Sequence, residues 1–284
     1  MFVRIRKTVV GASFATVLCG LSALASIPAS AADRPVDPSC RVTDRAHTYS
    51  SVQAAVSSAR AGDWLIVRGT CVGATTIDRN LSIIGLSERR SIATLDGGQG
   101  GPVLTIQDGV QVTLALLKIT NGSGHFDPVA GQTIGGGIYD DGGTVTVIGS
   151  QIVGNTSATS GGGIFAIRNT PTGGIVTLVS SQVTQNTSRY GGGIYVTSGS
   201  IILAGSSTVS QNTAWFGGGV YSDGGSVRAA DGTISTDPIS QIRLPAWTGR
   251  VAGNISNGGQ APGPGAPPNG PDCFGGGSFS ITCG

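Results

Sequence analysis

The sequence of 284 residues contains few charged and few aromatic side chains. Charged residues make up 11% and aromatic residues 5% of the chain, and lysine and glutamate occur only as Lys7, Lys118 and Glu88. Because there is no basic stripe, electrostatic binding to nucleic acid has no support, and we expect no nucleic-acid partner. The 48 glycines are unusual for a compact globule. The apolar residues are nevertheless regularly patterned, which argues against a disordered chain.

Only one apolar run is long enough to be considered as a membrane segment, and it lies at the start of the chain. Three basic residues precede the apolar stretch 9–27, and the small residues Ala29, Ser30 and Ala31 follow it. This order is typical of a secretory signal peptide, so we expect residues 1–31 to be cleaved. A membrane anchor is the alternative, which the directly following cleavage site disfavours. We therefore predict a secreted, extracellular protein without a membrane span after cleavage.

Four cysteines follow the signal segment, namely Cys40, Cys71, Cys273 and Cys283. An even number in an exported chain predicts two disulfides. Three pairings are possible, and we favour Cys40–Cys71 with Cys273–Cys283, one bridge at each end. Neither pair has the CxxC spacing of a zinc site, and the G-G-x-G-x-D calcium repeat is absent. We expect no metal and no cofactor; calcium is the alternative, although no motif supports it.

An internal repeat organises the middle of the chain. The motifs GGGIYDD, GGGIFAI, GGGIYVT and GGGVYSD begin at Gly135, Gly161, Gly191 and Gly217, at intervals of 26, 30 and 26 residues. A second mark recurs in register as SQIVGNT, SQVTQNT and STVSQNT. Short β-branched runs such as TVTVIG lie between the two marks. Each unit therefore holds three strand-length segments separated by turns.

Strands this short bury only alternate side chains and cannot stand alone. If the three segments of one unit stack on those of the next at about 4.8 Å, they enclose a continuous apolar interior. Leucine-rich or helical repeats are the alternative, but a leucine framework and a 3.6-residue period are both lacking. The fold class predicted is all-β, a single-stranded right-handed parallel β-helix of about six coils over residues 63–230, with an N-terminal capping helix.

The repeat also assigns three columns of side chains. We expect one apolar residue per coil to point inward, namely Ile138, Ile164, Ile194 and Val220. Pleating then directs the next residue outward, so an external aromatic row is predicted at Tyr139, Phe165, Tyr195 and Tyr221. Asparagines at a further corner should form a structural ladder by bonding to backbone and to each other, at Asn155, Asn186 and Asn212.

The remaining segments divide the chain further. Residues 32–62 are predicted as an N-terminal segment with an amphipathic capping helix within 49–63, and 123–134 as the longest loop. Residues 231–284 are predicted as a C-terminal cap or extended tail, with a Pro/Gly-rich linker at 257–271.

These motifs resemble two known patterns. YSSVQAAVSSARAGDWLIVRGTCVGATTIDRNLSIIG is similar to the entry coil of secreted right-handed β-helix proteins of the pectate-lyase-like superfamily. The GGGI and V-x-x-N marks resemble the GGAI and FxxN repeats of polymorphic outer-membrane proteins, with valine in place of phenylalanine. Together they cover about residues 48–230. The resemblance implies the fold and leaves function open, because this fold hosts lyases, hydrolases, adhesins and proteins without activity.

Candidate catalytic residues are few. Asp140 and Asp141 resemble the carboxylate pair of polygalacturonase-like glycosidases, but the accompanying G-H-G and R-I-K motifs are absent. The triplet Asp141-Gly142-Gly143 recurs at 223–225, as ordinary turn chemistry would produce. His125 and Asp127 could form an acid/base pair on the long loop. The R-x-P-x-x-R stretch of pectate lyases is missing.

Two functional hypotheses follow. The first is a non-catalytic exported β-helix that binds an extracellular polysaccharide or a cell-surface component through the aromatic row. The alternative is a carbohydrate-active lyase or glycoside hydrolase acting on an extracellular polysaccharide. The sequence favours the first, because acid, base and metal motifs are missing. It leaves the oligomeric state open.

Overall fold

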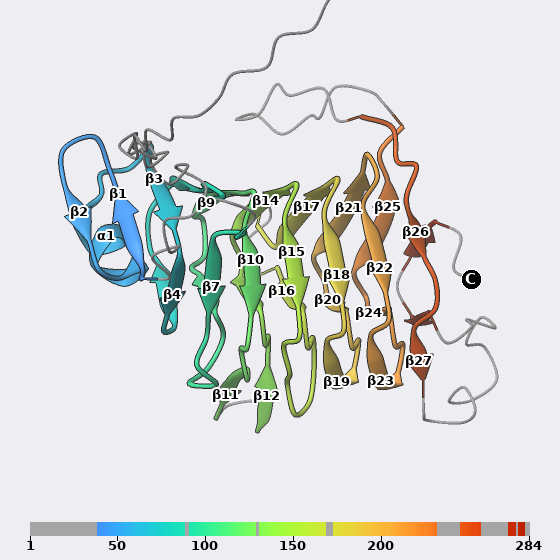
Figure 1. Cartoon of the computed structure of the whole chain (residues 1–284). Helices are drawn as coiled ribbons and strands as arrows, with labels where there is room; N and C mark the ends of the chain where they lie inside the picture. The colour runs from blue at the N-terminus through green and yellow to red at the C-terminus, as the bar shows by residue number, and fades with distance from the viewer. Residues whose placement is uncertain are drawn as a thin grey trace, which may run out of the picture. The chain divides into compact units, whose positions relative to one another are not determined.

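The computed structural model describes residues 39–88, 91–128, 131–168, 173–231, 245–256, 272–276 and 278–281. By compactness the chain divides into residues 1–35 and 36–284, and all described residues belong to the second unit. They form the predicted parallel β-solenoid (Figure 1). The predicted signal peptide and the linker 257–271 lie outside the described residues.

Three parallel sheets run along the solenoid, and each gains one strand per turn (Figure 1). Sheet 1 contains the parallel strands β3 (Asp63–Arg68), β6 (Leu81–Gly85), β9 (Gln111–Ala115), β14 (Thr144–Ile148), β17 (Ile175–Val179), β21 (Ser200–Ala204), β25 (Ser226–Ala229) and β29 (Ser278–Ser280). Sheet 2 contains β4 (Thr70–Val72), β7 (Thr94–Asp96), β10 (Lys118–Thr120), β15 (Gln151–Val153), β18 (Gln182–Thr184), β22 (Thr208–Ser210) and β26 (Arg250–Val251). Sheet 3 contains β5 (Thr75–Ile77), β8 (Leu104–Ile106), β13 (Ile138–Asp141), β16 (Ile164–Ile167), β20 (Ile194–Thr197), β24 (Val220–Asp223) and β28 (Cys273–Gly275).

A short fourth row of strands projects at the corner between sheets 2 and 3 and is called the ledge below. It consists of β19 (Thr187–Tyr190), β23 (Thr213–Phe216) and β27 (Ile255–Ser256), which pair in parallel. Single bridges through Ser160 connect it to the hairpin β11 (His125–Asp127) and β12 (Gln132–Ile134). The segment predicted as a long loop therefore contains an antiparallel hairpin, in which Phe126 lies opposite Thr133.

The solenoid continues beyond residue 230. Strands β26, β27 and β28 pair in parallel with β22, β23 and β24, although no glycine triplet precedes β28 and the triplet of this segment, at 275–277, begins at the last residue of that strand. The described parts of 231–284, predicted as a cap or tail, thus extend the same sheets. The long interruption before β26 hides this turn from a search for a regular period.

Alternating burial produces the core. Ile138, Ile164, Ile194 and Val220 are neighbours in successive strands of sheet 3, and all are fully buried. Val145, Val176 and Ile201 form a comparable column in sheet 1. Burying each such side chain contributes about 1.5–3 kcal/mol, so the continuous interior accounts for much of the folding free energy.

The glycine triplets form the corner that leads into sheet 3. Gly191 has φ of 60°, a backbone conformation that favours glycine. At Gly193 a Cβ atom would lie 2.6 Å from the carbonyl oxygen of Gly219 and 2.8 Å from the side-chain nitrogen of Asn212. Successive turns therefore approach each other too closely for any side chain, which explains why the motif requires glycine.

Replacing Gly193 by alanine is expected to destabilise the protein by about 3 kcal/mol, because the clash is with backbone and with a fully buried amide. The midpoint of urea unfolding measures the effect. Gly100→Ala is the matched control, since its nearest neighbour would be an ordinary contact at 3.7 Å. Equal midpoints for the two variants would contradict the close approach of the turns.

The asparagine ladder is buried and longer than predicted. Asn155, Asn186 and Asn212 are fully buried, and each side-chain amide donates to the side-chain oxygen of the next at 2.9–3.0 Å. The series continues from Asn212 to Asn254 and ends on Asp272, whose Oδ1 accepts from the Asn254 amide at 2.7 Å. A carboxylate, which only accepts, suits the end of a ladder whose amides all donate in one direction.

A second polar ladder was not predicted. Ser150, Ser181 and Ser207 are buried, and the hydroxyl of each accepts a backbone N–H from the preceding turn at 3.1–3.2 Å. The sequence carries the signal, because each serine is the first residue of the second repeated mark. Both ladders satisfy backbone groups at corners where the sheets are interrupted.

Three structural features cover the N-terminal end of the solenoid. Helix α1 (Val52–Ser58) places Val52, Ala55 and Val56 against the core, within the predicted segment 49–63. Strand β1 (Arg41–Thr43), paired with β2 (Thr48–Tyr49), adds to the edge of sheet 1 as an antiparallel strand. The predicted Cys40–Cys71 disulfide is present and connects this segment to β4. Among the described residues no helix has the length and apolar character to span a bilayer.

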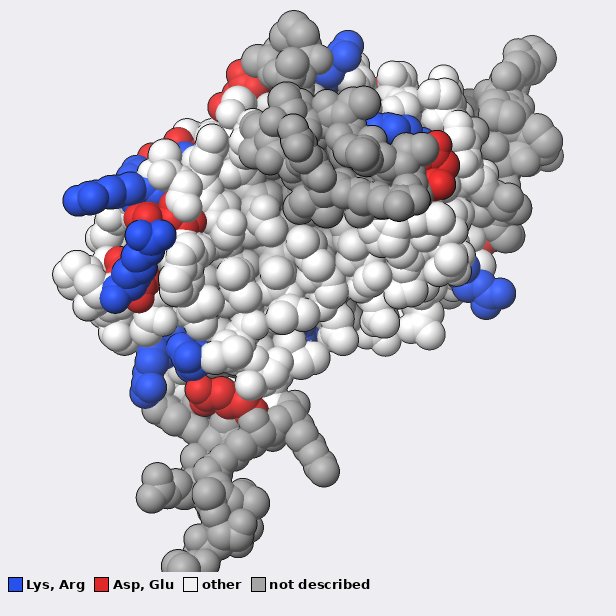
Figure 2. Space-filling model, turned by 90° about the horizontal axis from the view of Figure 1, so that it is seen from above, with Lys and Arg blue, Asp and Glu red and all other residues white. Residues whose placement is uncertain are grey.

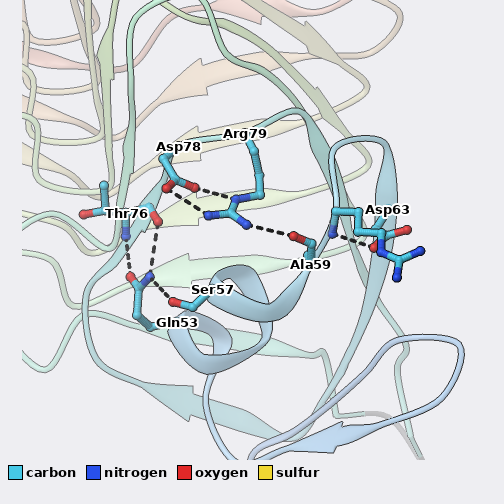
Figure 3. Close-up of polar contacts among 8 residues, drawn as sticks. Gln53, Ser57, Ala59, Asp63, Thr76, Asp78 and Arg79 are labelled. Atoms are coloured by element: carbon cyan, nitrogen blue, oxygen red, sulfur yellow. Dashed lines mark hydrogen bonds and ion pairs between the residues drawn. The ribbon is translucent and has the colours of Figure 1, made fainter.

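Gln53 covers the edge of sheet 3 in place of another strand. Its Oε1 accepts from the Thr76 N–H at 2.8 Å, and its Nε2 donates to the Thr76 carbonyl at 3.4 Å (Figure 3). Arg79 donates to the carbonyl of Ala59 at the end of the helix. Side chains thus replace the backbone partners that a preceding turn would supply, which protects an otherwise open edge.

Cys273, in β28, is also disulfide-bonded. Cys283, its predicted partner, lies outside the described residues, so this pairing stays a prediction.

Candidate functional site

A column of aromatic rings runs along the outer face of sheet 3. Tyr139, Phe165, Tyr195 and Tyr221 are register neighbours on β13, β16, β20 and β24. Phe165 and Tyr195, and likewise Tyr195 and Tyr221, stack in parallel with centroids 5.2 Å apart. Tyr139 contacts Phe165 edge to face at 5.7 Å. The four residues predicted as an outer row therefore do lie in one column outside the core.

The column extends at both ends beyond the predicted residues. Phe274 of β28 lies 5.5 Å from Tyr221, and His125 of the hairpin stacks on Tyr139 at 5.9 Å. On the ledge, Tyr190 and Phe216 form a shorter parallel stack at 5.5 Å. Tyr190 also contacts Tyr221 edge to face, so the two stacks meet across the glycine corner. We call these rings together the aromatic face.

The rings of the aromatic face stack on one another, so their flat faces are largely covered by neighbouring rings. Phe165, between two tyrosines, is only 6% exposed, whereas the tyrosines are half-buried. Burial, followed by the charge of a nearby aspartate, raises the pKa of the Tyr139 and Tyr195 hydroxyls above the ordinary tyrosine value. These hydroxyls stay protonated at neutral pH, and the surface offered to a ligand consists of ring edges and hydroxyl groups.

Carboxylates accompany the tyrosines at regular positions. The Tyr195 hydroxyl donates to Asp223 at 3.2 Å, and the Tyr139 hydroxyl is hydrogen-bonded to Asp141. Tyr139 and Tyr195 lie two strands apart in sheet 3, or about 9.6 Å. Their carboxylate partners differ in position, since Asp141 shares β13 with Tyr139 whereas Asp223 lies on β24, the strand after that of Tyr195. The aromatic face therefore carries two tyrosine hydroxyls that are hydrogen-bonded to carboxylates and are separated along the solenoid axis.

The hairpin of β11 and β12 places two further candidate site residues next to Tyr139. His125 stacks on Tyr139, and the charge of Asp127 acts on the same hydroxyl. His125, Asp127 and Asp141 thus surround Tyr139, although the sequence placed them on separate segments. Because the hairpin was expected to be a loop, their convergence was not predicted.

Asp140 does not belong to this surface. It is fully buried and alternates with Tyr139 and Asp141, so its carboxyl group points into the solenoid while Asp141 faces outward. Its Oδ1 accepts from the Gly143 N–H at 2.8 Å, and Oδ2 has no hydrogen-bond partner among the described residues. The two aspartates therefore do not form a carboxylate pair on one face of the sheet.

Sequence reasoning missed Tyr190, Phe216 and Phe274. Tyr190 and Phe216 each directly precede a glycine triplet, a position that could have been read as a second column. Phe274 also precedes three glycines, at 275–277, but they begin 58 residues after Gly217, outside the interval of 26–30 residues, and the register places Phe274 beside Tyr221 in sheet 3. Within the described ranges no group of three or more histidine, cysteine or acidic residues is placed to hold a metal ion.

No protein-family model, curated protein or solved structure matches the chain. The structure confirms the parallel β-solenoid, and the resemblance to the pectate-lyase-like superfamily and to polymorphic outer-membrane protein repeats stays a prediction from the motifs.

Proposed function

We propose that the protein is an extracellular, non-catalytic β-solenoid that binds an extended polysaccharide along its aromatic face. The observation that supports this proposal is the column of stacked rings, along which two tyrosine hydroxyls about 9.6 Å apart are hydrogen-bonded to carboxylates. Apolar edges with interspersed hydrogen-bonding groups suit sugars, which present C–H and O–H groups side by side. A spacing of about 9.6 Å suits a polymer whose repeat is two sugar units long. The Cys40–Cys71 disulfide supports an oxidising, extracellular location.

Tyr195→Phe is expected to weaken binding several-fold without changing stability by more than about 1 kcal/mol, because it keeps the ring and removes only the hydroxyl that donates to Asp223. Tyr195→Ala should in addition lower the free energy of unfolding by about 1–3 kcal/mol, because it removes two ring stacks. Retention on immobilised neutral, uronate and amino-sugar polysaccharides measures binding, and urea unfolding measures stability.

Thr184→Ala, on the outer face of sheet 2, is the control for this experiment. Equal retention of wild type, Tyr195→Phe and Tyr195→Ala on every polysaccharide would refute binding through the aromatic face. Cooperative loss of the whole structure in Tyr195→Ala would show that the ring belongs to the core.

A carbohydrate-active enzyme is the second candidate, favoured by the grouping of His125, Asp127 and Asp141 around Tyr139. A histidine and carboxylates beside a binding surface can supply acid and base. Incubation of the protein with the same polysaccharides distinguishes the two functions. New reducing ends or unsaturated products that disappear in His125→Ala would establish catalysis.

A further inference from the structure

A groove of about 420 Å³ lies on the outer face of sheet 1, on a different sheet from the aromatic face. Every residue that lines it is uncharged. Its hydrogen-bonding side chains are Asn80, Ser82, Gln111, Thr113, Thr144 and Thr146. The proposed function does not use this groove.

The hydroxyl groups of the groove are arranged in register. Ser82 lies beside Thr113, and Thr113 beside Thr146, on the neighbouring strands β6, β9 and β14. Gln111 and Thr144 form a parallel pair one pleat away. Neighbouring strands are about 4.8 Å apart, so the groove presents polar groups at a constant interval along the solenoid.

The groove has distinct ends. At the N-terminal end Trp64 lies opposite Ser82 on β3, with 40% of its surface exposed. Trp64 does not line the groove itself but continues its column, and it lines a neighbouring cavity of about 610 Å³ whose other residues include Arg60 and Asp63. At the other end the same column becomes buried, with Thr177 at 7% and Ile202 at 4% exposure. The accessible part of the column therefore runs from Trp64 to Thr146.

The uncharged lining limits the chemical class of ligand that the groove can bind. The strands labelled along the upper side of Figure 1 carry this face, and the view from above in Figure 2 shows a broad uncharged area with charged side chains towards its margins. An ionic ligand would lose hydration here without gaining an opposite charge. A neutral ligand rich in hydroxyl groups can exchange its hydrogen bonds with water for bonds to the threonine, serine and amide groups.

We propose that this groove is a second glycan-binding site, which holds a linear neutral polysaccharide with one sugar ring against Trp64. The tryptophan supplies an apolar platform, and the column from Ser82 to Thr146 supplies hydrogen bonds at the interval of the strands. Because the groove and the aromatic face lie on different sheets, one molecule can hold two polysaccharide chains. Simultaneous use of both sites would raise the avidity for a dense polymer.

The test uses affinity electrophoresis of the protein through gels containing hydroxyethyl cellulose, a soluble neutral β-glucan. Thr146→Lys places a charge in the groove, and Trp64→Ala removes the platform. Each should weaken retention at least tenfold. Thr184→Lys, the matched control on sheet 2, should bind as the wild type does. Urea unfolding of each variant confirms that the fold is retained, and Trp64→Ala keeps the test valid if Thr146→Lys does not fold.

Tyr195→Phe is run beside these variants to separate the two proposals. Loss in Thr146→Lys and Trp64→Ala with normal binding of Tyr195→Phe to all polysaccharides supports the groove and refutes the aromatic face. Loss in Tyr195→Phe alone, on any polysaccharide, refutes the groove and supports the aromatic face. Absence of wild-type retention on the neutral glucan, or equal retention of Thr146→Lys and Thr184→Lys, overturns the second site.

Discussion

Asp140→Asn is expected to stabilise the protein at neutral pH and to remove most of the pH dependence of unfolding between pH 4 and pH 8. The wild-type carboxyl group is fully buried, and its Oδ2 has no hydrogen-bond partner in the part of the chain that the structure describes. Burial raises its pKa from 3.8 to about 8, the hydrogen bond from Gly143 opposes this shift, and the charges of Asp141 and Asp108 add to it. The folded protein therefore holds a neutral aspartic acid at pH 7.

The sign of the effect follows from proton binding. Between pH 4 and pH 8 the unfolded chain has released the proton of Asp140 while the folded protein keeps it, so stability falls as pH rises. Below pH 4 both states are protonated, and this penalty disappears. Each pH unit above the pKa of Asp140 in the unfolded chain lowers the free energy of unfolding by about 1.4 kcal/mol. At pH 7 the loss amounts to about 4 kcal/mol. Asparagine keeps an acceptor for Gly143 and cannot ionise.

Urea unfolding of wild type and Asp140→Asn at pH 4, 5, 6, 7 and 8 measures the effect. The stability difference should be close to zero at pH 4 and grow with each unit. Asp223→Asn, at an exposed aspartate whose charge is not among those that act on Asp140, is the matched control and should keep the wild-type slope. Parallel pH profiles for wild type and Asp140→Asn would show that the buried group ionises at its ordinary pKa.

Asn186→Ala is expected to destabilise the protein by about 4 kcal/mol. Asn186 is fully buried, and its amide donates to Asn212 Oδ1 and to the Ile152 carbonyl, both at 3.0 Å. Its Oδ1 accepts from the backbone and the side chain of Asn155 at 2.9 and 3.0 Å. Alanine would leave several buried partners unsatisfied, and each such group costs about 1–3 kcal/mol.

Exchange of amide and carboxylate within the ladder gives a sharper comparison. Asn186→Asp keeps an acceptor but replaces the donating nitrogen, so an oxygen would face two other oxygens in the core. Asp272→Asn keeps the Oδ1 that accepts from Asn254 and should change stability by no more than about 1 kcal/mol. Midpoints of thermal and urea unfolding give the order expected, with Asp272→Asn close to wild type. Similar losses at both positions would contradict a ladder with one donor direction.

The repeated motifs predicted the part of the fold that depends on local pattern. The interval of the glycine triplets sets Ile138, Ile164 and Ile194 one turn apart, and strand pleating places the following ring outside. Asn155, Asn186 and Asn212 follow from the same register. The helix that covers the first turn was visible as an amphipathic segment, and the Cys40–Cys71 bridge as one of two favoured pairs.

Irregular segments were less predictable. Asn254 and Phe274 belong to a turn that follows a long interruption. Asn254 lies 42 residues after Asn212, and the glycine triplet at 275–277 follows β24 by far more than the regular interval, so the period does not point to either residue. The hairpin at His125 depends on antiparallel pairing between two segments without a strong strand pattern. The serine ladder carried a signal in the sequence, but a serine before a strand is common and its burial depends on neighbouring turns.

Residue order alone was enough to establish stacked turns, an apolar interior and an external row of rings, because in a solenoid each turn repeats the local conformation of the turn before it. Residue order could not show which surfaces remain open, since that depends on segments distant along the chain. The inward direction of Asp140, the mutual stacking that occupies the ring planes, and the uncharged groove that ends where Thr177 is buried all arise only when the turns are assembled.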